Sequence, residues 1–73
     1  NTSEAERLLR RAVAIEPDNS FAWSELARAQ DARGQGAMAR LSTAEAFFSV
    51  GLYDQALQFA ERAKTEGLDQ GST

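Results

Sequence analysis

Residue types that commonly carry out catalysis are sparse in this 73-residue chain. It contains no histidine and no cysteine, so it offers neither a Ser-His or Cys-His nucleophile nor the ligands of an ordinary zinc site. Carboxylates do occur close together, as in Glu4 with Glu6 and Glu61 with Glu66. Acidic residues on helices are usually solvated, so we interpret these pairs as protein surface. We therefore expect no catalytic residue, no metal ligand and no cofactor.

The stretch Gly34-Gln35-Gly36 brings two glycines close together, as phosphate-binding loops do. Such loops are longer, follow a strand and carry a lysine, and this stretch has none of these features. Glycine readily adopts the left-handed conformation that follows many helix C-termini. The stretch is therefore interpreted as a turn that ends a helix.

Basic and acidic residues are interleaved along the chain, and its formal net charge is −3. Because a nucleic-acid interface needs a clustered basic face, we expect no nucleic-acid partner. Arg7, Arg10 and Arg11 do lie close together, but Glu4, Glu6 and Glu16 lie around them in the sequence. Ion pairs at three- or four-residue spacing are the favoured interpretation, and a basic patch that faces a partner is the alternative. The apolar runs are too short for membrane insertion.

Helix-breaking residues recur about 17 residues apart, at Pro17, Gly34, Gly51 and Gly67. Each interval has the length of one helix and a tight turn, which is typical of helical repeats. The segments between them are rich in good helix formers, and their apolar residues recur every three to four positions. The sequence therefore predicts an all-α fold with four helices, over about residues 3–16, 20–33, 37–50 and 53–66.

Local signals predict where these helices begin and end. Ser3 and Glu6 have the spacing of a capping box for the first helix, and Pro17 disfavours helical geometry at the residue before it. The segment Asp18-Asn19-Ser20 offers N-cap residues for the second helix. Gly67 is predicted to end the fourth helix, with residues 69–73 frayed.

The short connections predict how the helices pack. A connection of two to four residues forces sequential helices to lie antiparallel, so we expect stacked helix-turn-helix hairpins. Small alanines allow close approach of the helix backbones, while large residues such as Trp23 fill the core.

The spacing resembles the tetratricopeptide repeat, a 34-residue helix-turn-helix unit. Trp23, Leu26 and Ala27 occupy the pattern's places for a tryptophan, a leucine and a small residue. The sequence departs from the pattern at Gln30, where the pattern has an aromatic residue, and at Thr43, where it has a large apolar one.

A second frame of the same repeat also fits the chain. Ala44, Phe47, Gly51, Ala56 and Ala63 match a unit whose turn lies at Gly51. In that frame the third helix is the first half of a unit, whereas in the frame closed by Pro17 it is the second half. Both frames stay open. Tyr53, just after the turn, is either a core residue that covers the turn or part of an exposed edge, and the resemblance favours the core.

A narrower likeness covers residues 21–64. The strings Gly36-Ala37-Met38-Ala39, Thr43-Ala44-Glu45 and Gly51-Leu52-Tyr53-Asp54-Gln55-Ala56 are similar to the C-terminal repeat region of bacterial zinc metalloproteases. In those proteins a periplasmic or membrane-associated HExxH domain precedes the repeats. The likeness implies a non-catalytic docking region in such a setting, and without it a cytoplasmic location is expected. Because HExxH is absent here, no catalytic residue is carried over.

The resemblance implies a surface that docks a peptide or a partner protein, lined mainly by the first helix of each pair. The alternative interpretations are ordinary helix surface, contact with a neighbouring repeat, and a passive structural spacer. The candidate partner-binding residues are Phe21, Ser24, Arg28 and Asp31 in the Pro17 frame, joined in the second frame by Leu41, Glu45 and Phe48.

The first helix would be the second half of an incomplete repeat, so the chain is interpreted as a fragment of a longer protein. The apolar face that a preceding helix would cover is then open. Leu8 and Ile15 are therefore candidates for exposed apolar surface or for self-association.

Overall fold

The computed structural model describes the backbone of residues 1–71 and the side chains of residues 1–67. Over this range the chain forms four α-helices and no strand. The predicted all-α fold is therefore confirmed. The helices are α1 (Thr2–Ile15), α2 (Ser20–Ala32), α3 (Gly36–Ser49) and α4 (Tyr53–Gly71).

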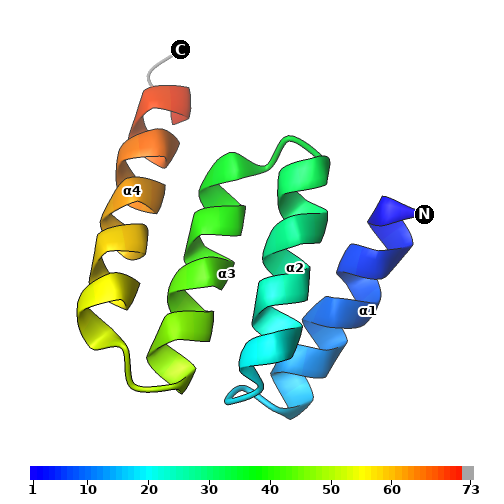
Figure 1. Cartoon of the computed structure of the whole chain (residues 1–73). Coiled ribbons are helices and arrows are strands. Elements are labelled where there is room, and N and C mark those ends of the chain that lie inside the picture. Colours follow the sequence, from blue (N-terminus) through cyan, green and yellow to red (C-terminus); the bar gives the residue numbers. More distant parts are fainter. Residues whose placement is uncertain (72–73) are drawn as a thin grey trace.

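Each helix packs against its neighbours in the chain, in the order α1, α2, α3 and α4 (Figure 1). Successive helices run in opposite directions, so the predicted helical hairpins are confirmed. The molecule is correspondingly thin, with Cα extents of 34 × 32 × 15 Å. In such a layer α2 and α3 have packed neighbours on two sides, whereas α1 and α4 have one free edge each.

The cap of α1 differs from the prediction. The Glu4 backbone N–H donates to the Asn1 side-chain oxygen over 2.9 Å, so Asn1 rather than Ser3 is the N-cap. The predicted capping box is wrong because the Glu6 carboxylate turns away from the helix start and accepts hydrogen bonds from Arg10.

The connection between α1 and α2 follows the sequence signals. α1 ends at Ile15, with Glu16 in a non-helical conformation (φ −127°, ψ 79°), as the following proline predicts. The Asn19 side-chain oxygen then accepts from the Ala22 backbone N–H over 3.0 Å and caps α2. Asparagine and aspartate are favoured here because their short side chains reach the free N–H groups of the first turn.

Two glycine turns join the remaining helices. Gly34 has a φ of 75° and Gly51 a φ of 83°, both in the left-handed region that glycine adopts without steric penalty. The stop predicted at Gly67 is wrong, because α4 continues to Gly71. A glycine weakens a helix without ending it when the residues that follow can also be helical. The frayed end predicted for residues 69–73 is therefore helical through Gly71, and residues 72–73 lie outside the described range.

The core begins where α1 meets α2. Val13, Ala22 and Leu26 are buried there, and Trp23 packs against them. The Trp23 indole N–H donates to the Pro17 carbonyl over 2.8 Å, so the ring also fastens the α1–α2 turn. Farther along, alanines fill the helix contacts, which lets α2, α3 and α4 approach closely. The buried alanines of α3 and α4 are Ala39, Ala44, Ala46, Ala56 and Ala63.

Gln30, which departs from the repeat pattern, is the most deeply buried large side chain, at 2% exposed. Its side-chain oxygen accepts a 2.6 Å hydrogen bond from the Ser42 hydroxyl, which joins α2 to α3. A buried amide is tolerated when it has such a partner. Thr43, the second departure, turns its hydroxyl to the Ala39 carbonyl over 2.9 Å.

Tyr53 is not a core residue. It is 62% exposed, and its ring lies 5.2 Å from the ring of Phe48, which is itself exposed. The expectation was wrong because Tyr53 is the first residue of α4, where the chain has only just turned and no third helix covers it.

Candidate functional site

A groove runs between α3 and α4 and encloses about 470 Å³. We name it the Glu45 groove, after the charged residue in its lining. Its walls are formed by side chains of α3 and α4, and its floor by small alanines at the contact between the two helices. The residues that line it are Leu41, Ala44, Glu45, Phe48, Tyr53, Ala56, Leu57 and Ala60.

The walls of the Glu45 groove expose large apolar side chains. Leu41 is 51% exposed, and Phe48 and Leu57 are each 60% exposed. Tyr53 extends the apolar wall beside Phe48. Exposed apolar residues grouped in a concavity commonly mark a binding surface. The Glu45 groove is therefore the best candidate for a recognition site in the described part of the chain.

Glu45 lies between Leu41 and Phe48 on the same helix face, at spacings of four and three residues. Its side chain is exposed, and no ion pair between residues 1 and 67 includes it. The groove thus offers a single carboxylate amid apolar walls. A hollow of about 310 Å³ continues from it toward α1, sharing Leu41 and Glu45 and reaching Arg10.

The seven candidate partner-binding residues do not form one surface. Leu41, Glu45 and Phe48 line the Glu45 groove. The other four, which we name the Arg28 face, lie on α2, and three of them, Ser24, Arg28 and Asp31, line a hollow of about 300 Å³ between α2 and α3. On α3 that hollow is lined by Ala39, Arg40 and Thr43, which lie on the helix face opposite Leu41 and Glu45. The Arg28 face consists of Phe21, Ser24, Arg28 and Asp31.

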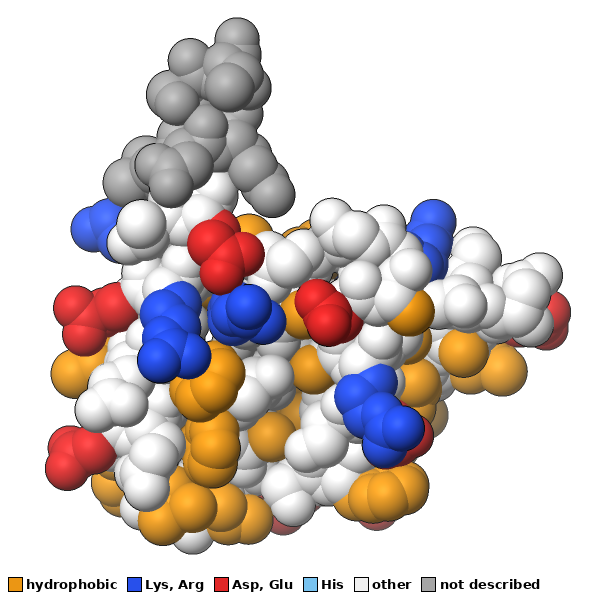
Figure 2. Space-filling model, turned by 45° about the horizontal axis from the view of Figure 1, so that its top comes forward, with side chains coloured by type: hydrophobic (Ala, Val, Ile, Leu, Met, Phe, Trp, Pro, Cys, Tyr) orange, Lys and Arg blue, Asp and Glu red, His pale blue; other side chains and the backbone are white. Residues whose placement is uncertain are grey.

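The Arg28 face has the character of ordinary helix surface. The Arg28 guanidinium pairs with Glu25 on its own helix over 3.3 Å, and its side chain is 80% exposed. Phe21, one helical turn before Ser24, is exposed and does not line the hollow between α2 and α3. The view in Figure 2 shows basic and acidic side chains scattered among hydrophobic ones, without a block of one sign.

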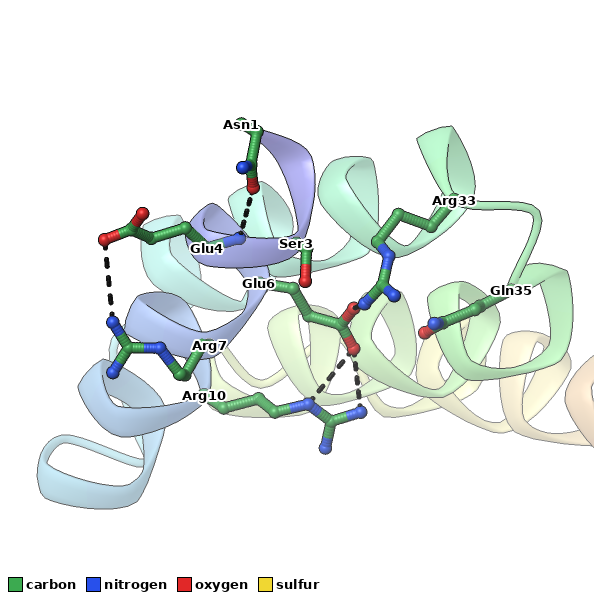
Figure 3. A pocket seen from close by; sticks show the side chains of 8 residues that line it. All are labelled: Asn1, Ser3, Glu4, Glu6, Arg7, Arg10, Arg33 and Gln35. Atoms are coloured by element: carbon green, nitrogen blue, oxygen red, sulfur yellow. Dashed lines mark hydrogen bonds and ion pairs between the residues drawn. The ribbon is translucent and has the colours of Figure 1, made fainter.

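The most enclosed charged residue lies at the other end of the molecule. Glu6 of α1 is 3% exposed, and its carboxylate points between two guanidinium groups (Figure 3). One carboxylate oxygen accepts from Arg10 over 2.8 and 3.1 Å, and the other accepts from Arg33, just beyond α2. We name Glu6, Arg10 and Arg33 the Glu6 clasp. It ties α1 to the end of α2.

The contacts of the Glu6 clasp lower the pKa of the Glu6 carboxyl group. The hydrogen bonds from Arg10 lower the pKa of Glu6 most, and Arg33 lowers it further. Burial opposes them, because removal from water disfavours the charged form. The pKa of Glu6 remains below the ordinary glutamate value, so the group is ionised at neutral pH.

A hollow of about 620 Å³ lies over the clasp, with polar and charged walls. Gln35 points into this region, and its side-chain oxygen is buried without a hydrogen-bond partner. Both clasp arginines are already hydrogen-bonded to Glu6, whose single negative charge offsets one of their two positive charges. We interpret the hollow as the surface of a structural ion-pair network. No cluster of potential metal ligands occurs among residues 1–67.

A comparison of this chain with protein families, curated proteins and solved structures finds no match. No helix in the described part is both long and apolar enough to cross a membrane.

The candidate residues taken from the sequence did not include Tyr53 and Leu57 of the groove wall. They also did not include Glu6, which was interpreted as solvated surface but is buried in the clasp. Leu57 lies four residues after Tyr53 and so on the same face of α4, a spacing that is visible in the sequence. The role of Glu6 depends partly on Arg33, which is 27 residues away in the chain. No local pattern predicts that contact.

Proposed function

We propose that this chain is a protein-interaction module that binds a helical segment of a partner protein in the Glu45 groove. The observation that carries the proposal is the set of exposed apolar side chains that line a groove between two helices. Helix-in-groove recognition uses this arrangement, since the apolar face of an amphipathic helix fills such a groove.

The charge in the groove specifies the partner further. Glu45 lies between Leu41 and Phe48, so a cationic side chain between two apolar ones would complement all three residues. On a helix this corresponds to apolar residues seven positions apart with lysine or arginine between them. The partner is therefore an amphipathic helix whose apolar stripe carries one basic residue.

We also infer that the helical hairpins are tetratricopeptide-type units. The left-handed turns at Gly34 and Gly51 and the buried alanines of α3 and α4 support this inference. The frame with its turn at Gly51 makes α3 the first helix of a unit, which agrees with the position of the groove. In the zinc metalloprotease setting the groove would dock clients or assembly partners beside a separate protease domain.

Fluorescence anisotropy with labelled helical peptides tests the proposed function. One peptide carries Leu, Arg and Leu at the matching positions, and a second has Glu in place of Arg. We expect the first peptide to bind more tightly, and Phe48→Ser to weaken its binding roughly tenfold or more, because truncating a central aromatic anchor typically costs more than about 1.4 kcal/mol.

Phe21→Ser is the matched control, since Phe21 is 73% exposed on the Arg28 face. We expect this variant to bind the first peptide as the unmodified chain does. Equal losses from both variants, or no preference for the basic peptide, would contradict the proposal. Binding that responds only to Phe21→Ser would move the site to the Arg28 face. Absence of peptide binding would favour a passive spacer.

A further inference from the structure

The free edge of α1 carries a stripe of two apolar residues and one basic residue. Leu8 is 52% and Ile15 75% exposed, and Arg11, also exposed, lies between them. The opposite side of α1 faces the core through Leu9 and Val13. We name Leu8, Arg11 and Ile15 the α1 stripe. Its exposed apolar character was predicted and is confirmed.

The α1 stripe has the chemistry expected of a partner for the Glu45 groove. Leu8 and Ile15 span seven residues, about 10 Å along a helix, as do Leu41 and Phe48. Arg11 is the positive charge between its apolar residues, and Glu45 is the negative charge between those of the groove.

The register of the two stripes also matches when the helices run antiparallel. If Leu8 lies opposite Phe48, the residue three positions later, Arg11, lies opposite Glu45, three positions earlier on α3. Four positions further along α1, Ile15 then lies opposite Leu41. A parallel arrangement would place Arg11 one residue away from Glu45, so antiparallel docking fits best.

We propose that the Glu45 groove binds the α1 stripe of a second copy of this chain, with Arg11 paired to Glu45 across the interface. The inference rests on the proposed function, because it names the occupant of the same groove. Of the other charges beside the stripe, Glu4 and Arg7 pair with each other over 3.6 Å, and the Glu16 carboxylate accepts a hydrogen bond from the Asn19 side chain over 3.4 Å. The pairing gives the two copies both apolar contact and charge complementarity.

This contact joins two different surfaces, so each dimer still has one free stripe and one free groove. Such head-to-tail contacts continue into longer assemblies unless the geometry closes a ring. We therefore expect the average mass to rise with concentration rather than to stop at a dimer.

Sedimentation equilibrium across a range of concentrations tests the proposal. Arg11→Glu and Glu45→Arg should each weaken association about fivefold or more, because each replaces an attraction with a repulsion. The chain that carries both substitutions restores an opposite-charge pair in reversed order, so its association should recover. Arg28→Glu makes the same kind of charge reversal on the other face and should leave association unchanged.

Circular dichroism checks that each variant keeps its helices; if Glu45→Arg does not, Leu57→Ser replaces it as the groove variant. A chain that stays monomeric at every concentration overturns the inference. So does an association that neither Arg11→Glu nor Glu45→Arg weakens, or one that the variant with both substitutions does not recover. If the basic helical peptide binds while the chain stays monomeric, only the second-copy inference fails. If the chain associates through the swapped pair but binds no free peptide, the external-partner function fails instead.

Discussion

The helix contacts at the two ends of this layer differ in which side chains they bury and which they leave exposed. At the α1–α2 contact a carboxylate is buried, since Glu6 is held by Arg10 and Arg33. At the α3–α4 contact large apolar side chains such as Phe48 and Leu57 are exposed. Both arrangements depart from the rule that apolar groups are buried and charges are solvated. They do so for different reasons.

At the α1–α2 contact every group in the clasp has a partner, and the neighbouring core is sealed by Leu26 and Trp23. The buried carboxylate is therefore satisfied within the molecule, and Glu6 stabilises the fold. At the α3–α4 contact the exposed apolar groups and Glu45 have no complement within the described chain. An incomplete surface of this kind is suited to recognition. The difference between Glu6 and the groove residues is therefore that the charge of Glu6 has partners within the molecule, whereas the apolar groups of the groove are left open.

The largest expected effect on stability comes from substituting a leucine in each of the two regions. Leu26→Ala should lower the free energy of unfolding by about 2–5 kcal/mol, because it opens a cavity at a site that is 2% exposed. Leu57→Ala, in the exposed groove wall, should change it by less than about 1 kcal/mol. Urea unfolding followed by circular dichroism measures both. Similar losses would mean that the groove wall is part of the core.

A second prediction concerns the buried polar contact in the middle of the layer. Ser42→Ala should lower the free energy of unfolding by about 1–3 kcal/mol, because it leaves the Gln30 side-chain oxygen buried without its donor. Adding Gln30→Leu should recover most of that loss, since both polar partners are then absent. A loss that is unchanged in the double variant would show that the hydrogen bond contributes little.

The smallest expected effect is at the Glu6 clasp. Glu6→Gln should lower the urea midpoint at neutral pH, but less than Ser42→Ala does, because the side chains of Arg10 and Arg33 are 49% and 38% exposed and can be hydrated. The pKa of Glu6 is lower in the folded state than in the unfolded state. Its stabilising contribution is therefore present at neutral pH and is lost as pH falls below about 4.3 through the depressed value.

The midpoint difference between Glu6→Gln and the unmodified chain should accordingly narrow at acid pH. Glu4→Gln is the control, since Glu4 belongs to an exposed pair with Arg7, and it should change the midpoint little at any pH. A Glu6→Gln difference that stays constant down to pH 3 would contradict the ion-pair explanation.

Much of the fold followed from local sequence signals. Pro17, Gly34 and Gly51 set the chain reversals because their conformational preferences act on the residues beside them. The helix end predicted at Gly67 was wrong because a glycine weakens a helix without requiring it to end. The capping box at Ser3 failed because Glu6 had better partners elsewhere.

The candidate site was only partly predictable. Leu41, Glu45 and Phe48 share one face of α3, and helical spacing alone reveals this. Their combination with Tyr53 and Leu57 depends on how α4 packs against α3. The sequence also grouped the Arg28 face with these residues, whereas the structure puts the two sets on opposite sides of the layer.

The sequence by itself determined four helices and the tight turns between them, because helix propensity, proline geometry and left-handed glycine are local properties of the chain. Only the tertiary structure decided that Glu6 is buried between two arginines, that Gln30 is satisfied by Ser42, and which faces of the helices form a groove. These outcomes depend on contacts between residues far apart in the chain. Such contacts are fixed by how the helices pack.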